Sequence, residues 1–544
     1  MGSMRMFVVI VNIYLRLKII MKKQIIGAVV FLLPMAMSAQ SAIDAYTLSH
    51  TDFRGTAKFM SMGGAFGALG GDITAITQNP AGIGVYRSSD MSATLDIDMQ
   101  STESSTIGYS EKNSQTKVSC NSVGYVGAYR IDSDVMRTFN WGFSYNRSAN
   151  RARRYSGQMH NLSTSLSNYV AGVTNAEGWT ANDLAGASYS SSSAPWMSIL
   201  AYDGSMINPQ ADGKSFQGLY GDGTSGYGEY EVIEEGGVDE FNLSFGGNIK
   251  DVLYWGITVG MTDIDYKLYS YYGEALDNAY INDDIQGVGN VVVGPASYAL
   301  ENYLRTTGKG YNVKLGMILR PTNALRLGVA FHTPTYYSLT DNYYTSLGFN
   351  YGGQQSSVET NDGYDGITDY RLRTPWRFIG SVAGVIGNKG ILSFDYEYVA
   401  YNSMSLKDDL GYPYTDTNFD IKDYYKGQSI IRVGGEFRVD KQLSLRAGYS
   451  YQSSPVDADA LNNRKNIITV STTPAYSFDK STQYYTFGAG YKFGRFYADL
   501  AYVHKTRESE YHAFSPVVEY GEESPSNIVK DNNDRIVATI GYRF

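Results

Sequence analysis

Apolar and polar residues alternate with a period of two along most of the chain after about residue 88. This period is typical of β-strands whose two faces meet different environments. The last segment shows it clearly, because its apolar face is the row Ile536, Ala538, Ile540, Tyr542 and Phe544. By the same pattern we predict fourteen strands, at 88–99, 118–132, 138–149, 237–249, 251–272, 303–320, 323–340, 364–386, 389–405, 427–439, 441–454, 480–493, 495–508 and 533–544.

The connections between these strands alternate strictly in length. Every second connection is a tight turn, as at 249–251, 320–323, 387–390 and 439–442. The others are long and rich in Gly, Ser, Asn and Asp, as at 150–236, 273–302 and 455–479. A soluble β-sandwich also alternates, but short turns at one end and long loops at the other are typical of an outer-membrane barrel. The sequence therefore predicts an all-β fold, a 14-stranded antiparallel transmembrane β-barrel with long extracellular loops and both termini on the periplasmic side.

Aromatic residues recur at outward positions of the predicted strands, as expected of the girdles at the two membrane interfaces. Examples are Tyr125, Tyr129 and Phe394. The chain also ends on an aromatic residue, at the end of the last alternating strand. We interpret Tyr542 and Phe544 as a signal for the barrel assembly machinery.

A secretory signal peptide is predicted at residues 21–40, MKKQIIGAVVFLLPMAMSAQ. Lys22 and Lys23 form its basic start, and an apolar stretch and small residues follow. The segment before it is interpreted as an upstream mis-start or added remnant, with a membrane anchor as the alternative. No later stretch approaches ~18 uninterrupted apolar residues. We therefore predict that residues 1–39 are an upstream segment plus signal peptide, and that the protein is exported to a Gram-negative outer membrane.

Composition narrows the classes of function. The chain of 544 residues has a net charge of −9 and no basic cluster with interleaved aromatics, so no nucleic-acid partner is expected. Its single cysteine, Cys120, excludes an intramolecular disulfide framework and a multi-cysteine metal site. The scattered histidines suggest no serine–histidine–acid set. We expect no metal, no cofactor and no enzymatic activity, and we predict a monomer.

Residues 40–87 do not alternate, and they precede the first strand. Asp72 is placed to cap a short helix over the sequence ITAITQ. Asn79 stands before a proline and ends that helix, and Gly82 then permits a tight bend. The segment is too rich in glycine for a lipid-facing strand. We predict a compact hatch, or plug, in the lumen of the barrel, with the barrel itself over 88–544.

Charged residues at inward positions of the strands support this interpretation. The predicted lumen lining includes Asp96, Asp98, Arg326, His332, Arg432 and Glu436. Charges of both signs would hold a plug in place. A water-filled pore is the alternative, since porin lumens are also polar. The lone His332 is interpreted as a polar filler, with ligation of a molecule such as haem as the alternative.

Three motifs resemble the FadL/TodX-type outer-membrane transporters of long-chain fatty acids and other hydrophobic compounds. MGGAFGALGGDITAITQNPAGIG at 62–84 is similar to their N-terminal hatch with its Asn-Pro-Ala motif. GKGYNVKLGMILRPTNALRLGVAFHTPT at 308–335 and RVGGEFRVDKQLSLRAGYSYQSSP at 432–455 are similar to two of their hairpins. The resemblance runs from about residue 50 to the C-terminus and implies a fourteen-stranded barrel plugged by the hatch.

The resemblance also implies a transport route. A hydrophobic ligand is captured at the outer loops, passes to a pocket near the hatch and leaves sideways through a gap in the wall. The hatch and gate residues are then Asn79, Pro80, Ala81, Gly82 and Gly142. We expect Asn79 to hydrogen-bond the backbone of the third strand around Gly142, Pro80 to fix the bend, and Ala81 to stay small where the wall approaches closely.

The longest predicted loop, 150–236, contains apolar residues at helical spacing, followed by the apolar stretch APWMSILAY at 194–202. We predict exposed apolar helices that capture ligand. The alternative is that they pack on each other as a lid. The predicted capture residues are Leu162, Leu166, Tyr169, Val170, Trp196, Ile199 and Leu200.

The predicted function is passive uptake of hydrophobic small molecules similar to long-chain fatty acids, with hatch-controlled lateral release into the membrane. The alternatives are a receptor for a haem-like or aromatic ligand and a structural or adhesive plugged barrel, whereas an outer-membrane hydrolase is disfavoured. The expected partners are the ligand, outer-membrane lipid and lipopolysaccharide, and the assembly machinery.

Overall fold

The computed structural model describes residues 40–106, 108–131, 133–282, 291–387, 389–470, 472–516 and 524–544. The predicted upstream segment and signal peptide lie outside the described residues. The barrel is built from β1 (Asp90–Thr106), β2 (Tyr109–Arg130), β3 (Met136–Asn150), β4 (Arg153–His160), β7 (Ser225–Ile249), β8 (Leu253–Asn282), β9 (Val291–Leu319), β10 (Leu325–His332), β11 (Tyr336–Tyr351), β13 (Gly366–Arg373), β14 (Arg377–Ile386), β15 (Gly390–Ala400), β16 (Ser405–Asp408), β17 (Gly427–Arg438), β18 (Leu443–Gln452), β19 (Tyr476–Phe493), β20 (Phe496–His512) and β21 (Ser526–Arg543).

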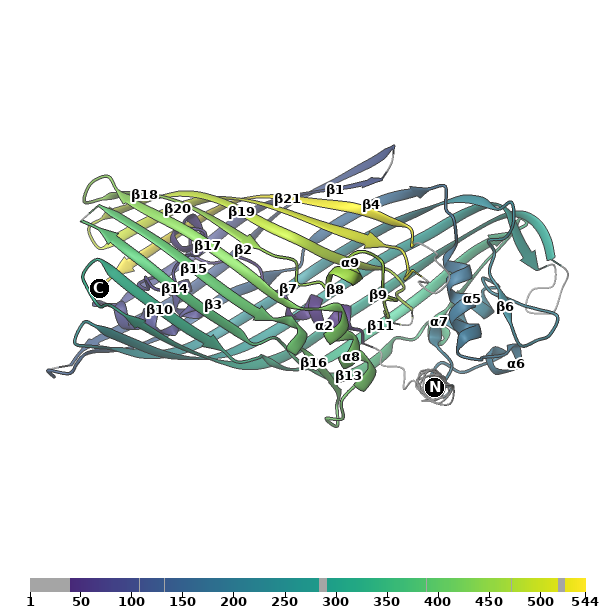
Figure 1. The fold of residues 1–544 in the computed structure, drawn as a ribbon, viewed down its shortest axis with the longest axis horizontal. Helices are drawn as coiled ribbons and strands as arrows, with labels where there is room; N and C mark the ends of the chain where they lie inside the picture. The colour runs from purple at the N-terminus through teal and green to yellow at the C-terminus, as the bar shows by residue number, and fades with distance from the viewer. Residues whose placement is uncertain are drawn as a thin grey trace, which may run out of the picture. The chain divides into compact units, whose positions relative to one another are not determined.

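These strands form a closed 14-stranded antiparallel barrel (Figure 1). β1 closes it by pairing with β21, from Asp90 opposite Arg543 to Ser105 opposite Ile528. Interrupted barrel strands explain the larger number of labels, because β3 and β4, β10 and β11, β13 and β14, and β15 and β16 each make up one barrel strand. Proline, which has no N–H for the ladder, lies at two interruptions as Pro334 and Pro375. The predicted fold class and strand number are confirmed.

Several strands extend further than the polarity pattern predicts. Residues 273–302, expected as a loop, belong largely to β8 and β9, and 150–236 includes β4 and the start of β7. Beyond β11 the chain continues through β12 (Gln354–Glu359) and η2 (Thr360–Gly363). Outside a bilayer the outward face of a barrel no longer has to be apolar, so the alternation fades although the strand continues.

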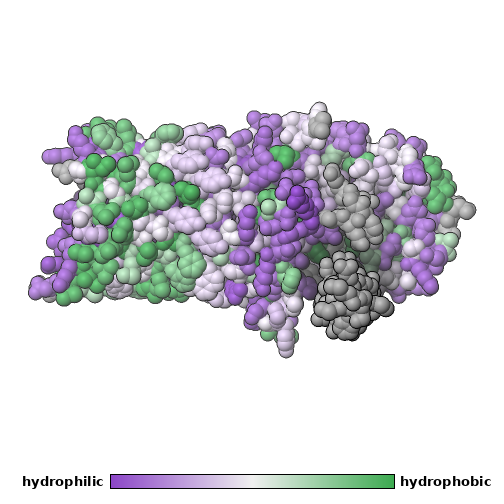
Figure 2. Space-filling view, viewed as in Figure 1, coloured by the Kyte–Doolittle hydropathy of each residue, from purple (hydrophilic) through white to green (hydrophobic). Residues whose placement is uncertain are grey.

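Large apolar side chains are exposed on the outer face near the tight turns, as a surface against lipid chains requires. In β21, Ile536 and Ile540 are 41% and 65% exposed, whereas Val537 between them is fully buried. Figure 2 shows hydrophobic residues concentrated over this part of the barrel, and mostly polar residues beyond it. The alternation in the last strand therefore has the facing that the sequence predicts.

The lumen holds the N-terminal helices, drawn in purple in Figure 1: α2 (Ala42–Ser49), α3 (Ala57–Ser61), α4 (Ile73–Gln78) and the 3-10 helix η1 (Pro80–Val85). As predicted, Asp72 caps α4, because its Oδ1 accepts hydrogen bonds from the backbone N–H groups of Thr74 (2.9 Å) and Ala75 (3.3 Å). Asn79 ends α4 in an extended conformation, and its side chain accepts a hydrogen bond from the Ala81 N–H (3.1 Å) to cap η1. The N-terminal region is therefore a hatch inside the barrel.

Short helices and strands lie in the connections that join the barrel strands away from the tight turns, with α5 to α7 at the far end and α8 and α9 nearer the middle (Figure 1). They are α5 (Leu166–Ala176), α6 (Ala181–Leu184), α7 (Trp196–Asp203), β5 (Asn208–Pro209), β6 (Phe216–Gln217), η3 (Tyr401–Ser403), α8 (Thr415–Tyr424) and α9 (Ala458–Leu461). No helix among the described residues is both long and apolar enough to cross a membrane.

Candidate functional site: a seam in the barrel wall and its closure by the hatch

The backbone ladder between β2 and β3 stops part-way along the wall. It runs from Arg130 opposite Thr138 to Ser122 opposite Asn146, and continues no further among the described residues. Beyond that point β2 still pairs with β1, while β3 and β4 pair with β7. We call the stretch where residues 109–121 face residues 147–160 the seam. Side chains bridge it in place of the ladder, as in the 2.8 Å hydrogen bond from Asn113 Nδ2 to Ser156 Oγ.

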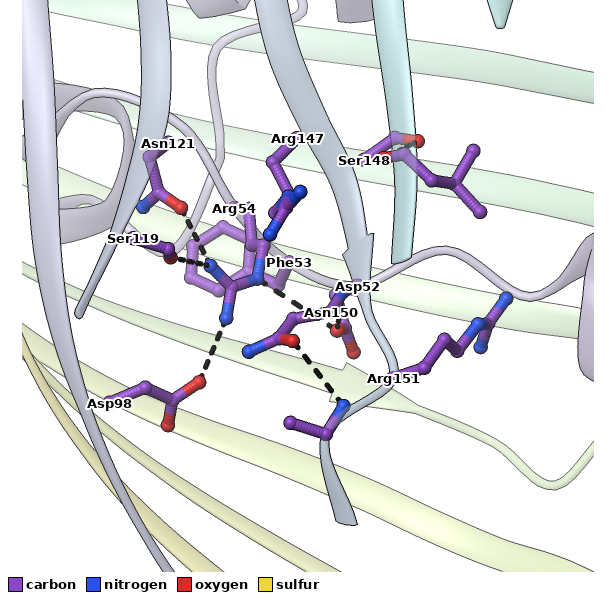
Figure 3. Close-up of polar contacts among 12 residues, drawn as sticks. Asp52, Phe53, Arg54, Asp98, Ser119, Asn121, Arg147, Ser148, Asn150 and Arg151 are labelled. Carbon is purple, nitrogen blue, oxygen red and sulfur yellow. Dashed lines mark hydrogen bonds and ion pairs between the residues drawn. The ribbon is translucent and has the colours of Figure 1, made fainter. Parts of the chain in front are cut away.

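β-Bulges on β2 and β3 mark the end of the seam that is nearer the tight turns. The register of β1 and β2 shifts between Thr94 and Leu95, which leaves Asn121 without an opposite residue. The register of β3 and β7 shifts between Arg147 and Ala149, which leaves Ser148 without an opposite residue as well. A bulge disrupts the ladder locally and re-aims a side chain. Asn121 is accordingly fully buried, with its side chain toward the lumen (Figure 3).

The N-terminal segment closes the seam from the inside at these two bulges (Figure 3). On the β3 side, the Asp52 N–H donates to the Ser148 carbonyl oxygen (2.9 Å), and the Asn150 N–H donates to the Asp52 carboxylate (3.0 Å). On the β2 side, Arg54 Nη1 donates to Asn121 Oδ1 (2.7 Å). One short hatch segment thus binds both borders of the seam. Sequence reasoning did not identify Asp52 or Arg54 as site residues.

Arg54 also belongs to a buried network of charges. Its guanidinium pairs with Asp96 (2.9 Å) and Asp98 (2.8 Å) of β1, and Asp98 also pairs with Arg535 (3.1 Å) of β21. Burial opposes ionisation of Asp52, but the positive charges of Lys505, Arg535 and Arg54 outweigh it and hold the pKa of Asp52 well below its usual value. Removing one partner of such a pair leaves the other charge buried alone, at a cost of about 3–5 kcal/mol.

The Asn-Pro-Ala turn of the hatch binds a different wall from the one the sequence predicts. Asn79 Nδ2 donates to the Gly67 carbonyl oxygen (2.6 Å) and to the Met317 carbonyl oxygen of β9 (3.3 Å). The predicted hydrogen bond to β3 around Gly142 is therefore wrong. Gly142 is regularly paired with Val126 and Ser244, so its backbone groups are already used, and the irregularity of β3 lies further along, at Ser148.

β3 nevertheless holds the hatch, through a side chain. Asn140 Nδ2 donates to the carbonyl oxygens of Ile83 (2.7 Å) and Tyr86 (3.0 Å), which belong to η1 and its end. A Cβ added at Gly142 would lie 3.3 Å from the Ile83 side chain. Gly142 is therefore a tight contact with the hatch rather than part of a gap.

Inward-facing glycines bring the wall into direct contact with the hatch. A Cβ at Gly316 would lie 1.9 Å from Asn79 Oδ1, and one at Gly256 would lie 2.2 Å from the Pro80 carbonyl oxygen and 2.8 Å from the Ala81 nitrogen. Ala81 itself is fully buried, and Gly82 packs on Gly70 within the hatch. Glycine is required at such close backbone approaches. The wall glycines at which an added Cβ would come within 3.0 Å of the hatch are Gly124, Gly246, Gly256, Gly316, Gly328, Gly434, Gly448 and Gly488.

The predicted lumen-lining residues face inward, and most of them bind the hatch. Arg326 Nη1 donates to the Leu69 carbonyl oxygen (2.8 Å), and His332 Nε2 lies 2.9 Å from the Gln78 carbonyl oxygen. The remaining contacts are Asp96 and Asp98 with Arg54, Arg432 with Glu397 (2.6 Å), and Glu436 with Arg446 (2.7 Å). These contacts agree with the prediction that charged side chains hold a plug. The hatch occupies the part of the lumen that water would fill in the alternative of an open pore.

Residues 198–502 match the sequence profile of a family described as outer membrane protein transport protein (OMPP1/FadL/TodX). This match spans more than half of the 544 residues. The chain belongs to the OMPP1/FadL/TodX family. Membership makes it an outer-membrane transport protein, in agreement with the barrel and its apolar band.

A solved structure of this family shares the fold. The crystal structure of a Pseudomonas aeruginosa FadL homologue is 14% identical, covers 91% of this chain and 100% of its own, and has a TM-score of 0.50. The Pseudomonas putida toluene transporter TodX (15% identity, 90% and 98% coverage, TM-score 0.45) and the Ralstonia pickettii toluene transporter TbuX (14% identity, 90% and 98% coverage, TM-score 0.45) are also similar. A comparison with curated protein sequences gave no match.

Two cavities lie on either side of the N-terminal segment of this FadL/TodX-family barrel. One, of about 150 Å³, is lined by α2 and by side chains that include Tyr155, Tyr266 and Arg507. The other, of about 180 Å³, lies against residues 48–54 and 74–78 of the hatch. His50 and Asp52 line both cavities, so the segment that closes the seam also separates them.

The predicted ligand-capture residues form a loop core instead of an open groove. Leu166, Ile199 and Leu200 are fully buried, and Leu162 and Val170 are 6% and 3% exposed. Tyr169 packs against the same cluster, and Trp196 stacks at its edge against Tyr343 with ring centroids 5.2 Å apart. The expectation of exposed helices is therefore wrong, because the helices bury their apolar faces on one another and on the strands. α5 also begins only at Leu166, after β4. A capture role for these residues stays a prediction.

The two C-terminal aromatics lie beside the first barrel strand. Phe544 is 57% exposed, its ring meets that of Tyr542 edge-on at 5.0 Å, and its N–H donates to the Ser89 carbonyl oxygen (3.0 Å). Their role as an assembly signal stays a prediction.

We expect Asn79→Ala to loosen the hatch without unfolding the barrel. The change leaves the buried carbonyl groups of Gly67 and Met317 without this donor, at a cost of about 1–3 kcal/mol. Amide hydrogen exchange of residues 62–85 should accelerate and ligand uptake should fall, while the protein still migrates as a folded, heat-modifiable barrel on gels. Asn323→Ala in the exposed β9–β10 turn is the control. Unchanged exchange in Asn79→Ala would show that these hydrogen bonds do not hold the hatch.

Proposed function

We propose that the protein takes up hydrophobic small molecules across the outer membrane and releases them sideways, through the seam, into the bilayer. Uptake is passive, the ligands are similar to long-chain fatty acids, and the long-loop end of the barrel faces outward with both termini periplasmic. The proposal is carried by one observation: the ladder between β2 and β3 stops at two bulges, and a segment of the hatch occupies the place where it stops.

Lateral release suits a hydrophobic cargo. A straight path through the barrel would deliver it to water, whereas an exit in the wall delivers it to hydrocarbon at once. The seam has the chemistry for a reversible exit, because side chains and not a continuous ladder join its borders. Residues 52–54 must leave before it opens. Moving them breaks hydrogen bonds to both Ser148 and Asn121, and the same motion joins the two cavities.

The volumes of the two cavities support the displacement of residues 48–54 during transport. An apolar cavity of about 150 Å³ accommodates a molecule such as benzene, whereas ligand pockets generally measure about 300–1,000 Å³. Each lumenal cavity is near the lower value. By volume a single aromatic ring fits either closed cavity, although charged side chains such as that of Asp52 line both of them, and a long alkyl chain requires displacement of residues 48–54. The TodX and TbuX structures are those of toluene transporters by name, which keeps an aromatic ligand as the second candidate.

The experiment fixes the segment to the wall. Asp52→Cys and Ser148→Cys, made in a Cys120→Ser background, place two thiols where the backbones already touch, and dibromobimane joins them. Uptake of radiolabelled oleate and of labelled toluene into barrel-containing liposomes should stop after cross-linking. The matched control is Lys267→Cys with Arg305→Cys, which are register partners on the outer face of β8 and β9.

The outcomes separate the candidates. Undiminished uptake after cross-linking at 52 and 148 would mean that ligand does not leave through the seam. Loss of oleate uptake with retention of toluene uptake would assign the closed-state cavities to small aromatics. A barrel that takes up neither probe before cross-linking is a structural plugged barrel.

A further inference from the structure

The outer face of β8, β9, β11 and β13 changes its chemistry in a fixed order along the strands. β9 shows the whole order at its outward positions. Starting from the tight turn, these are the apolar Leu319, Met317, Leu315 and Val313, then Tyr311, Lys309, Thr307, Arg305, Tyr303 and Glu301. Leu315 and Tyr311 are 45% and 58% exposed, as expected of a lipid-facing band and its aromatic girdle. Cations and then aromatic residues with carboxylates follow beyond the girdle.

The cations form a row across four strands. Strand register places Lys309 opposite Ser338, Ser338 opposite Arg371, and Arg371 opposite Lys407. All three basic side chains are exposed, and the row lies two residues beyond the girdle pair Tyr311 and Tyr336. Three positive charges therefore stand in one register row, which runs obliquely across the tilted strands beside the edge of the apolar band.

These cations are available to a ligand. Lys309 and Lys407 form no ion pair with any residue that the structure describes. Arg371 donates to the Asp409 carbonyl oxygen (2.6 Å), which leaves its charge uncompensated by that contact. Acidic residues are also present on this face, as Asp263 opposite Lys309 and Asp369 further out. In the row itself the positive charges outnumber the negative ones.

A ladder of aromatic rings follows beyond the cations. Tyr303 lies between Tyr269 and Tyr344 in register, with ring centroids 5.0 Å and 5.8 Å away. Glu301 accepts hydrogen bonds from the hydroxyl groups of Tyr303 (3.1 Å) and Tyr269 (3.4 Å). Exposed aromatic faces stack on the apolar faces of sugar rings, and carboxylates accept hydrogen bonds from sugar hydroxyls.

Strands β18 to β21 lack cations at the corresponding positions. At comparable outward positions beyond the apolar band, β18 to β21 carry Tyr451, Gln483, Thr506 and Asn532, none of them cationic. The basic row on β9, β13 and β16 is therefore not continued on β18 to β21.

We propose that this face binds lipopolysaccharide, with acyl chains on the apolar band, phosphates on Lys309, Arg371 and Lys407, and core sugars on the tyrosine ladder. The occupant follows from the sequence of chemistries, because an outer-leaflet glycolipid presents hydrocarbon, phosphate and sugar in that same order from the membrane outward. The proposal rests on the outward orientation of the long loops but not on the transport ligand or the seam.

The test titrates fluorescent rough-type lipopolysaccharide onto the folded full-length barrel in detergent. The variant K309Q/R371Q/K407Q should bind on the order of a hundredfold more weakly, because each basic residue near an anionic lipid surface contributes about 1 kcal/mol. The control K112Q/K214Q/K530Q removes the same charge from exposed lysines elsewhere and should bind like the parent. Heat-modifiable migration on gels checks that every variant is folded.

Two further ligands separate phosphate from sugar. Dephosphorylated lipid A should bind the parent and the triple variant equally. Tyr303→Ala should weaken binding of rough lipopolysaccharide but not of lipid A, which carries no core sugars. Equal lipopolysaccharide affinity in parent and K309Q/R371Q/K407Q, or an equal loss in the charge-matched control, would overturn the proposal.

Discussion

Deleting residues 40–87 is expected to turn the barrel into an open pore for small hydrophilic solutes. The hatch occupies the lumen, and its backbone lies against wall glycines such as Gly256, Gly316 and Gly328. Its removal leaves a lumen lined by charged groups that water can solvate, including Asp395 and Arg432. We expect single-channel conductance in planar bilayers to rise at least about tenfold, because a water-filled lumen conducts as porins do.

The barrel itself should survive the deletion. Strand pairing closes between β1 and β21 without any hatch residue, and the apolar outer face is intact. Buried charges such as Asp96 and Asp98 lose Arg54, but they gain water in the emptied lumen, so the penalty for unpaired burial falls. Folded yield should therefore remain high, as checked by heat-modifiable migration on gels.

The control deletion removes the exposed loop segment 185–193, which touches no part of the lumen lining described above. It should conduct like the parent. If the protein lacking 40–87 is folded yet as tight as the parent, the hatch does not plug the lumen, and hatch-controlled release loses its basis.

The fold was largely predictable because the strands and turns of a membrane barrel follow from short-range patterns in the sequence. Alternation in the row from Ile536 to Phe544 indicates that one side of this strand faces lipid. Asp72 and Asn79 indicate the two ends of α4, which depend on neighbouring residues only. The prediction of strands failed where the outward side of a strand no longer faces lipid. In 273–302 the inward side chains, such as Leu276 and Leu300, are buried in the loop core and the outward face no longer meets lipid, so no apolar outward row is required there and the alternation weakens.

The seam was not predictable in the same way. It depends on bulges at Asn121 and Ser148, and a bulge changes facing by one residue without a distinctive sequence pattern. Asp52 and Arg54 acquire their roles only because the folded hatch brings them to those bulges. The hatch contacts did leave a signal, since glycines recur at inward positions of successive strands.

Gly316→Val is expected to displace the hatch from its contact with the barrel wall. The first side-chain carbon would lie 1.9 Å from Asn79 Oδ1 and 3.0 Å from the Ala81 nitrogen, so Asn79 has to move away from β9. Overpacking of this kind costs about 1–3 kcal/mol, which falls on the contact between hatch and wall. We expect channel openings in planar bilayers that the parent lacks, and faster hydrogen exchange in residues 62–85.

Gly380→Val is the matched control, because it adds the same side chain to β14 at an exposed position with nothing within 4 Å of the new Cβ. It should be folded and closed like the parent. Adding Asn79→Gly to Gly316→Val removes the atoms that clash, so the double variant should regain part of the seal even though the Asn79 hydrogen bonds are lost. A Gly316→Val protein that is folded, closed and slow to exchange would show that contact between Asn79 and β9 does not hold the hatch.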